Sequence, residues 1–358
     1  MKHLNKFYRD DILREYISGS KSLRKYLFYL FIFIILSGLS FYTISKIIGQ
    51  KSKFSIFKSY SFSIYLFLVM CLLIYFIFDG LRLFFILKTL KTDVKLIHIV
   101  KLVFLNLFVA NVTPFASGGG VVQIYFLNKK GVSLGDATAA TTIRTVIAMT
   151  FVFFSTPLVI LFEKNLSSVF PQKKVLFYIS LFAIFYFSFF YVVIFKNKLV
   201  KRIVVNILFF LNSKKLLSDK KYLKLKRKII REIKVFGRNL AYFFKGDKKY
   251  LASVILSTIF FLLAELSFSV ILIKGLGYDV SAISIILMQI VIIFFMYFAP
   301  TPGATGVAEG SYSFLFSKFV GGNDIVPLIF AWRFLTKYFG MVIGMVIFFV
   351  SFLGGKNN

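Results

Sequence analysis

The sequence predicts an all-α integral membrane protein of about eight helical spans, which include two re-entrant broken-helix hairpins in an inverted-topology repeat. Of its 358 residues, 58% are hydrophobic, and the mean hydropathy is +0.82. Average soluble chains are about 45–50% apolar, so a soluble domain would leave much of this surface in water. Apolar runs of roughly 20 residues, the length that crosses a bilayer, recur along the chain. These runs are continuous instead of alternating, which argues against a transmembrane β-barrel.

The predicted elements follow one another in a simple order. Polar, basic residues 1–25 come first and are expected in the cytoplasm. Continuous apolar segments then predict spans at about 26–48, 61–85, 96–112, 136–162, 175–195, 250–274, 281–299 and 325–352. Two apolar helices too short to cross alone are predicted at about 121–128 and 308–319. The chain therefore divides into a first membrane repeat at 26–195, a cytoplasmic basic amphipathic linker at 196–249 and a second membrane repeat at 250–358.

Two segments rich in glycine and proline interrupt the apolar chain and resemble each other. The first, at 111–120, reads NVTPFASGGG, and the second, at 299–310, reads APTPGATGVAEG. When Pro114 is aligned with Pro302, an offset of 188 residues, identical or similar residues also occupy the pairs Thr113/Thr301, Ala116/Ala304, Ser117/Thr305 and Gly118/Gly306. Paired broken segments at corresponding places in two halves of a membrane protein are typical of a transporter's binding site.

The distribution of lysine and arginine predicts how the spans are oriented, because cytoplasmic loops carry an excess of positive charge. Residues 196–249 hold 18 Lys/Arg against 3 Asp/Glu, so this linker is placed in the cytoplasm. Tracing the spans from there puts both chain termini in the cytoplasm, as in a multi-pass protein of the cell membrane. The same tracing returns residues 96–128 to the cytoplasm and residues 281–320 to the outside. Each stretch is expected to be a re-entrant hairpin, with re-entrant motifs at 111–128 and 299–319 that enter from opposite faces.

The chemistry of the breaks supports re-entry. Unpaired backbone N–H and C=O groups are costly in hydrocarbon, so irregular backbone persists only where protein buries it or where it lines a wet cavity. Pro114 and Pro302 are expected to end the incoming helices. Helices that restart near Val121 and Val307 would direct their N-termini at the midplane. There, free N–H groups and the helix dipole bind anions such as phosphate.

The candidate substrate-binding residues of the breaks are Asn111, Thr113, Pro114, Gly118, Gly119, Gln123, Pro302, Gly303, Gly306 and Glu309. For each glycine the sequence leaves two interpretations open. One is close approach of the backbone to a ligand, and the other is helix packing through small residues. Asn111 and Gln123 could hydrogen-bond a headgroup or satisfy the broken backbone.

Charged residues at membrane depth complete the candidate site, because a charge inside a span costs roughly 2.5 kcal/mol or more unless it is paired. Glu309 opens the second returning helix, and its candidate partners are Arg333, Lys337 and Arg144. The two arginines occupy nearly equivalent repeat positions, and each could pair bidentately with a phosphate or carboxylate. For Glu309 and Arg333 a structural salt bridge is an equal alternative. Glu265 lies in the middle of an apolar span and could bind a cationic headgroup or carry a proton.

Other features point to lipid and to little else. Asp79 and Arg82 are spaced three residues apart near a helix end, which predicts a local ion pair. The formal net charge of +31 lies mainly between apolar segments, so its expected partners are anionic lipid headgroups. Ten Lys/Arg in residues 214–234 predict an interfacial amphipathic helix, with RNA binding as a weak alternative. No cofactor, metal or nucleic acid is expected, because Cys71 is the only cysteine and no catalytic motif is present.

These motifs resemble those of the lysylphosphatidylglycerol synthase transmembrane family, the flippase-like region of the multiple peptide resistance factors and their stand-alone relatives. The residues that carry the resemblance are TPFASGGG at 113–120, Gln123, Gly131, PTPGATGVAEG at 300–310 and Arg333. The resemblance covers roughly residues 20 to 350. Many relatives have a Gly-Glu pair in the first motif, where this chain has three consecutive glycines. Full-length synthases add a cytoplasmic acyltransferase domain that uses aminoacyl-tRNA, and this chain is expected to be a stand-alone member without it.

The resemblance implies a protein that moves a phospholipid, such as an aminoacylated phosphatidylglycerol, between membrane leaflets, and that performs no lysyltransferase chemistry itself. Two alternatives stay open: a membrane anchor or partner subunit of a lipid or glycan transferase, and a gradient-coupled transporter of a small solute. Assembly as a homo-oligomer or with a separate synthase is equally open. Because only the second motif carries an acid, the site is expected to be asymmetric, with backbone groups from the first hairpin and charge from the second.

Overall fold

The computed structural model describes residues 20–49, 54–163, 172–214 and 218–353, which are almost entirely helical and contain no strand. A first set of elements comprises α3 (Phe62–Thr89), α4 (Leu96–Val112), η2 (Pro114–Ala116), α5 (Ser117–Lys129) and α6 (Leu134–Phe162). A second set comprises α11 (Lys248–Gly275), α12 (Ala282–Met296), η3 (Pro302–Ala304), α13 (Val307–Phe316) and a final column of α14 (Gly322–Arg333), η4 (Phe334–Tyr338) and α15 (Phe339–Leu353). The two sets correspond one to one along the chain.

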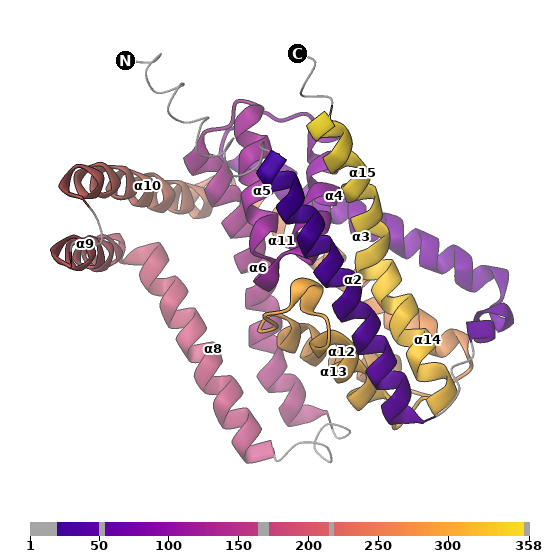
Figure 1. The fold of residues 1–358 in the computed structure, drawn as a ribbon. Helices are drawn as coiled ribbons and strands as arrows, with labels where there is room; N and C mark the ends of the chain where they lie inside the picture. The colour runs from indigo at the N-terminus through magenta and orange to yellow at the C-terminus, as the bar shows by residue number, and fades with distance from the viewer. Residues whose placement is uncertain (1–19, 50–53, 164–171, 215–217, 354–358) are drawn as a thin grey trace.

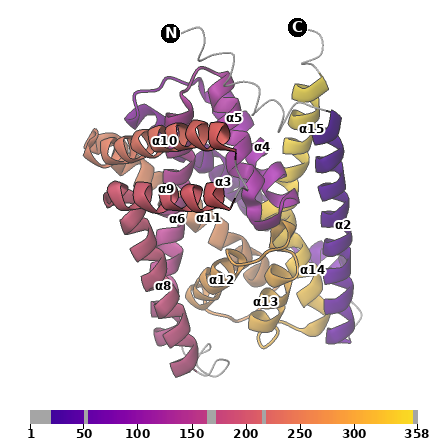
Figure 2. The same cartoon turned by 60° about the vertical axis from the view of Figure 1, so that its left-hand side comes forward.

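The two sets face opposite ways. In both views α4 and α5 lie in the upper half of the molecule, whereas α12 and α13 lie in the lower half (Figures 1 and 2). The chain descends through α6 and ascends through α14 and α15. α3 and α11 pack against each other more extensively than any other pair of described elements, and they join the two halves. The predicted inverted arrangement is therefore present.

Each half contains one hairpin, α4–η2–α5 in the first and α12–η3–α13 in the second. Proline begins each connecting one-turn helix, at Pro114 and at Pro302. α4 and α12 have 17 and 15 residues, hence lengths of about 25 and 22 Å at 1.5 Å per residue, short of a hydrocarbon core of about 30 Å. Below, the first tip means residues 113–117 and the second tip means residues 297–306.

The helices account for the predicted spans as follows. Five stretches among the described residues are long and apolar enough to cross a membrane: Tyr26–Ile48, Phe62–Thr89, Leu134–Phe162, Lys248–Gly275 and Gly322–Ser351. Shorter apolar helices occur at Leu96–Val112, Phe177–Ser188 and Ala282–Met296, of which the first and last are the incoming arms of the hairpins. The prediction of an all-α membrane protein is confirmed. The predicted span at 325–352 is interrupted by η4, a π-helical turn that the sequence did not predict.

Among the described residues, four α-helices have no counterpart in the other half: α2 (Ser20–Ile48), α8 (Gln172–Phe195), α9 (Asn197–Ser213) and α10 (Asp219–Lys245). The short η1 (Phe54–Ser59) follows α2 and contacts α14. α2 packs against α4, α13 and α14, and Figure 2 shows α2 and α8 at opposite edges of the molecule. α9 and α10 pack together crosswise to α8, so the basic linker is a pair of helices instead of one. Residues 1–19 and 215–217 of the predicted polar segments lie outside the described residues.

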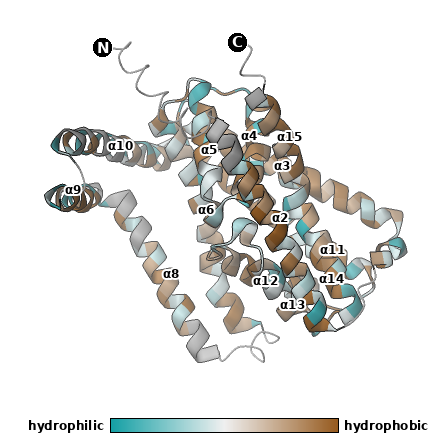
Figure 3. Ribbon diagram, in the orientation of Figure 1, coloured by the Kyte–Doolittle hydropathy of each residue, from teal (hydrophilic) through white to brown (hydrophobic). Residues whose placement is uncertain are grey.

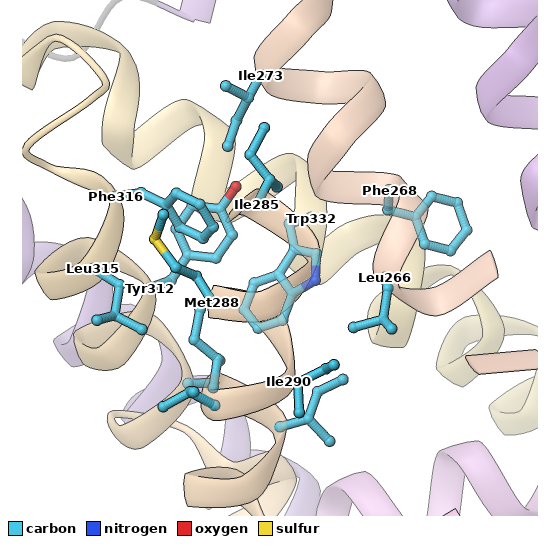
Figure 4. Close-up of a cluster of buried hydrophobic side chains, with 14 of the residues drawn as sticks. Leu266, Phe268, Ile273, Ile285, Met288, Ile290, Tyr312, Leu315, Phe316 and Trp332 are labelled. Atoms are coloured by element: carbon cyan, nitrogen blue, oxygen red, sulfur yellow. The ribbon is translucent and has the colours of Figure 1, made fainter. Parts of the chain in front are cut away.

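Apolar side chains are divided between the interior and the outer faces. A buried cluster that includes Tyr312, Phe316 and Trp332 joins α11, α12, α13 and α14 (Figure 4). Hydrophobic residues also run along the outsides of α2, α3 and α8 (Figure 3), where Phe31, Phe67 and others are exposed. Exposed apolar helices of this kind suit contact with lipid, and they leave the interior to hold the charged groups described next.

Candidate functional site

The tips of the two hairpins meet near the middle of the molecule. η2 and α4 both contact η3, and Gly303 lies directly against Asn111. A Cβ atom on Gly303 would lie 3.1 Å from Asn111 Oδ1 and 2.9 Å from a ring carbon of Phe33 on α2. The Asn111 amide nitrogen donates to the Leu107 carbonyl at 2.7 Å, which fixes the side chain in this position. The close approach of the tips therefore requires glycine at position 303.

Both tips hold the backbone in a conformation that most side chains disfavour. Phe115 and Ala116 have φ angles of 52°, and Gly303 and Ala304, at the aligned positions, have φ angles of 60° and 58°. Non-glycine residues in this left-handed region cost about 1–3 kcal/mol each. Among the other described residues, Lys91 alone combines a positive φ with a side chain. Strain concentrated at two matched positions favours a functional role for the tips.

A buried ion pair closes the second tip. Glu309 in the first turn of α13 and Arg333 at the end of α14 are fully buried, and their Oε1 and Nε atoms are 2.9 Å apart. Glu309 Oε2 accepts hydrogen bonds from the Gly306 N–H at 2.6 Å and from the Ser40 hydroxyl of α2 at 3.3 Å. Arg333 Nη2 donates to the Gly303 carbonyl at 2.7 Å. Of the three candidate partners of Glu309, the structure places Arg333 against it.

This arrangement changes the expectation for the helix N-termini. α13 begins at Val307, where it was expected, but its own Glu309 already accepts the N–H of the preceding Gly306. α5 begins at Ser117, four residues before the expected position, and the Gly118 N–H donates to Thr113 Oγ1 at 3.0 Å. Each tip therefore satisfies one of its first N–H groups internally, which reduces its capacity to bind an external anion.

A second ion pair joins α11 to the final column of the second half. Lys337 Nζ lies 3.0 Å from Glu265 Oε1, so Lys337, offered by the sequence as a partner for Glu309, pairs with Glu265 instead. Lys337 belongs to η4, and the Tyr75 hydroxyl of α3 donates to the Thr336 carbonyl of the same turn at 3.4 Å. Turns of π-helix inside α-helices are frequent at functional sites.

A third charged group lies in the first half. Asp79 on α3 pairs with Arg82, one turn along the same helix, and with Arg144 on α6. Arg144 Nη2 lies 2.6 Å from each oxygen of the Asp79 carboxylate. The predicted local pair between Asp79 and Arg82 is confirmed. Arg144, one of the three candidate partners of Glu309, pairs instead with Asp79 in the first half.

Two of the three glycines that follow the first tip, in the first turn of α5, are packing positions. A Cβ atom on Gly118 would lie 2.7 Å from a Val109 methyl carbon, and one on Gly119 would lie 2.5 Å from Asn106 Oδ1. Both glycines therefore let α5 pack closely against α4, as small residues do in membrane bundles. Gly120 has open space around its Cβ position. Gln123 is buried on the same helix, and its amide nitrogen makes no hydrogen bond to the described residues.

Parts of both tips are exposed although they lie between the two halves. Phe115 is 67% exposed, and Tyr297 and Phe298, at the start of the second tip, are 37% and 40% exposed. Gly306 is exposed as well. In Figure 1 the orange segment that precedes α13 crosses the front of the molecule between α6 and α2. Irregular backbone at such a depth is stable where it borders water or protein, so this face is the candidate opening of the site.

The structure thus separates the predicted site residues into groups. One group lies in the two tips or directly beside them and comprises Asn111, Thr113, Pro114, Gly118, Gly119, Pro302, Gly303, Gly306, Glu309 and Arg333. Arg144, Glu265 and Gln123 lie apart from it, on α6, α11 and α5. Sequence reasoning missed Ser40 and the pairing of Lys337 with Glu265. The spacing of four residues between Arg333 and Lys337 was an available signal, since it places both side chains on one helix face.

Comparison with known proteins gives two matches. The family model described as "Lysylphosphatidylglycerol synthase TM region" matches residues 29–344. A curated protein of Archaeoglobus fulgidus, described as "UPF0104 membrane protein", is 24% identical over 264 residues, which cover 74% of this chain and 79% of that protein. The range that the family model matches includes both tips and all three charged groups.

Proposed function

Because the chain belongs to the family of the lysylphosphatidylglycerol synthase transmembrane region, we propose that it moves a phospholipid, such as an aminoacylated phosphatidylglycerol, between the leaflets of the cell membrane. The observation that carries this proposal is the meeting of two strained, partly exposed hairpin tips from opposite halves. Broken helices that meet between inverted repeats form the substrate sites of many transporters.

The distribution of polarity supports a lipid as the substrate. The interior carries ion pairs, at Glu309–Arg333, Glu265–Lys337 and around Asp79, whereas the outer helices expose apolar side chains. A headgroup could therefore pass along the charged interior while its acyl chains remain in the surrounding bilayer. The cost of carrying a headgroup through hydrocarbon is lowered by those interior partners.

The orientation proposed for the chain follows from charge. The start of α2 and the end of α15 lie at the same side of the molecule, together with α9 and α10 (Figures 1 and 2). α9 and α10 lie within the linker in which lysine and arginine greatly outnumber acids. By the positive-inside rule this side is the cytoplasmic one, and the basic face of α10 lies against anionic headgroups there.

Movement of a fluorescent phospholipid in liposomes tests the proposal. The purified chain is reconstituted, and a membrane-impermeant reductant reports the fraction of labelled lipid that reaches the outer leaflet. We expect wild-type liposomes to lose more fluorescence than protein-free liposomes. If liposomes with well-folded protein lose no more fluorescence than protein-free liposomes, lipid movement by the chain alone is refuted. Co-purification of a transferase would then favour the role of a membrane anchor.

The assignment of the tips is tested separately with the double variant Glu309→Gln/Arg333→Met, which removes both charges of the buried pair together. Its folding is verified first by thermal unfolding and by size-exclusion chromatography. We expect the folded double variant to move lipid more slowly than wild type. If it moves lipid at the wild-type rate, the tips are not the site, whereas the proposed function stands.

A further inference from the structure

Of the three buried charged groups described above, two are balanced in charge and one is not. Glu309–Arg333 and Glu265–Lys337 each pair one negative with one positive charge. The group on α3 and α6 sets Asp79 against two arginines, Arg82 and Arg144. Within this group of three side chains, one positive charge is therefore left without a counter-charge.

The internal repeat explains this imbalance. Arg333 in the second half pairs with Glu309, which its own hairpin supplies. At the position aligned with Glu309, 188 residues earlier, the first hairpin has Val121. Arg144, the near counterpart of Arg333, therefore has no acid in its own hairpin and pairs with Asp79, which also pairs with Arg82. We expected the charge of the site to come mainly from the second hairpin. The uncompensated charge of this group, however, belongs to the first half.

The geometry of the group leaves donors available. Arg82 and Arg144 are 4% and 8% exposed, and the Nε atom of each makes no hydrogen bond to the described residues. The Arg82 guanidinium lies 3.6 Å from the centre of the Phe261 ring, which covers one of its faces. Buried N–H groups without acceptors and a buried charge without a partner are both costly. An anion with several acceptor oxygens would relieve both costs at once.

The group also lies at a depth that a headgroup must pass. Asp79 precedes the end of α3 by ten residues, and Arg144 follows the start of α6 by ten, so each lies about 15 Å inside its helix end. Tyr297, which is partly exposed at the start of the second tip, packs edge to face against Phe153 of α6, the helix that carries Arg144. The second tip therefore adjoins one of the two helices that carry this group.

We propose that Asp79, Arg82 and Arg144 form a subsite for one singly charged phosphate group, with the two arginines as donors and Asp79 as the residue that positions them. The assignment of that phosphate to a lipid headgroup rests on the proposed function. A phosphodiester carries a single negative charge, which matches the single uncompensated positive charge of the site. Asp79 cancels one of the two arginine charges, and one phosphodiester neutralises the other.

Thermal unfolding of the full chain in an uncharged detergent tests the subsite. The additives are inorganic phosphate, a short-chain phosphatidylglycerol and a short-chain diacylglycerol without phosphate, at one ionic strength. We expect phosphatidylglycerol to raise the Tm of wild type by several degrees and diacylglycerol to leave it unchanged. A rise with phosphatidylglycerol alone identifies the lipid as the source of the anion, and a rise with inorganic phosphate as well identifies the anion itself. No rise with either overturns the subsite.

Variants of the group give the sharper result. Arg82→Met keeps the apolar contact with Phe261 and leaves a neutral Asp79–Arg144 pair, so we expect weaker anion binding, by about tenfold or more, without loss of basal Tm. Lys101→Met removes one exposed positive charge on α4 and should retain the full rise in Tm. If Arg82→Met binds the anion as wild type does, the subsite is refuted.

Asp79→Asn keeps the test decisive if Arg82→Met does not fold. It leaves two arginines without a carboxylate, so we expect a lower basal Tm and a larger rise with the anion than in wild type. An unchanged or smaller rise contradicts the subsite. The liposome assay separates the two proposals: anion binding without lipid movement removes the proposed function alone, and wild-type lipid movement by Arg82→Met removes the subsite alone.

Discussion

Removal of Arg333 alone should destabilise the chain strongly, because it leaves a buried carboxylate without a partner. In Arg333→Met, Glu309 stays fully buried and keeps its hydrogen bonds from the Gly306 N–H and the Ser40 hydroxyl. It loses the guanidinium whose Nε lies 2.9 Å away. Breaking one side of a buried ion pair costs about 3–5 kcal/mol. The Gly303 carbonyl loses its donor as well, which adds roughly 1–3 kcal/mol.

The double variant Glu309→Gln/Arg333→Met should recover most of this loss. Glutamine is neutral, and its carbonyl oxygen can still accept the Gly306 N–H, so only the unpaired Gly303 carbonyl remains. Replacement of both partners of a buried pair is often close to neutral, and we expect the double variant to cost roughly 1–3 kcal/mol. The coupling free energy between the two positions should therefore exceed about 2 kcal/mol.

The measurement is a double-mutant cycle on the free energy of unfolding in mixed micelles, with Glu309→Gln as the second single variant. Wild type and the three variants are unfolded reversibly by a denaturing detergent. Two results would refute the reasoning: a cost of Arg333→Met below about 1 kcal/mol, or a double variant whose cost equals the sum of the two single variants. Either result would mean that water or another group neutralises Glu309.

Three further predictions concern packing and exposure. Gly118→Ala should lower the free energy of unfolding by about 1–3 kcal/mol, because its Cβ would meet Val109 at 2.7 Å. Gly120→Ala should not lower it, since nothing lies within 4 Å of that Cβ position, and equal effects of the two variants would contradict the packing role. Gly344→Ala should be destabilising because its Cβ would overlap the Phe104 carbonyl, and Gly38→Ala, with open space, should gain up to about 1 kcal/mol; both are measured by denaturant unfolding in micelles. Phe115→Cys should react with a charged maleimide in liposomes while Phe31→Cys on the outer face of α2 does not, and equal labelling would argue against water at the tips; native Cys71 is buried and gives a low background.

Much of the architecture could be predicted because hydrophobic length and charge bias act locally. The apolar runs, the paired prolines and the lysine-rich linker were enough to predict the hairpins and their opposite orientation. The π-helical turn at 334–338 could not be predicted, because it depends on how α14 and α15 pack against α4 and α11. The extension of the linker into two crosswise helices is likewise a matter of tertiary packing.

The site was harder to predict, because the partners of a buried charge are set by distances across the fold. Glu309 had three possible cations in the sequence, and packing of α14 against α13 decides for Arg333. Arg144 matched Arg333 in repeat position, yet Asp79 on a neighbouring helix takes it. The sequence could show that the first hairpin lacks an acid, but only the structure shows that this absence leaves a charge uncompensated in the same half.

The contact between the two tips also determines how well the molecule seals the membrane against ions. If the hairpins are re-entrant, as their lengths predict, the barrier across this part of the protein is assembled from two pieces that touch at Gly303 and Asn111. If the tips separated, a continuous path for water would connect the two sides of the membrane. A larger residue at position 303 should therefore raise passive proton leak in liposomes even where the fold survives. On this reasoning, the absence of a side chain at position 303 serves the permeability barrier as well as the packing of the two tips.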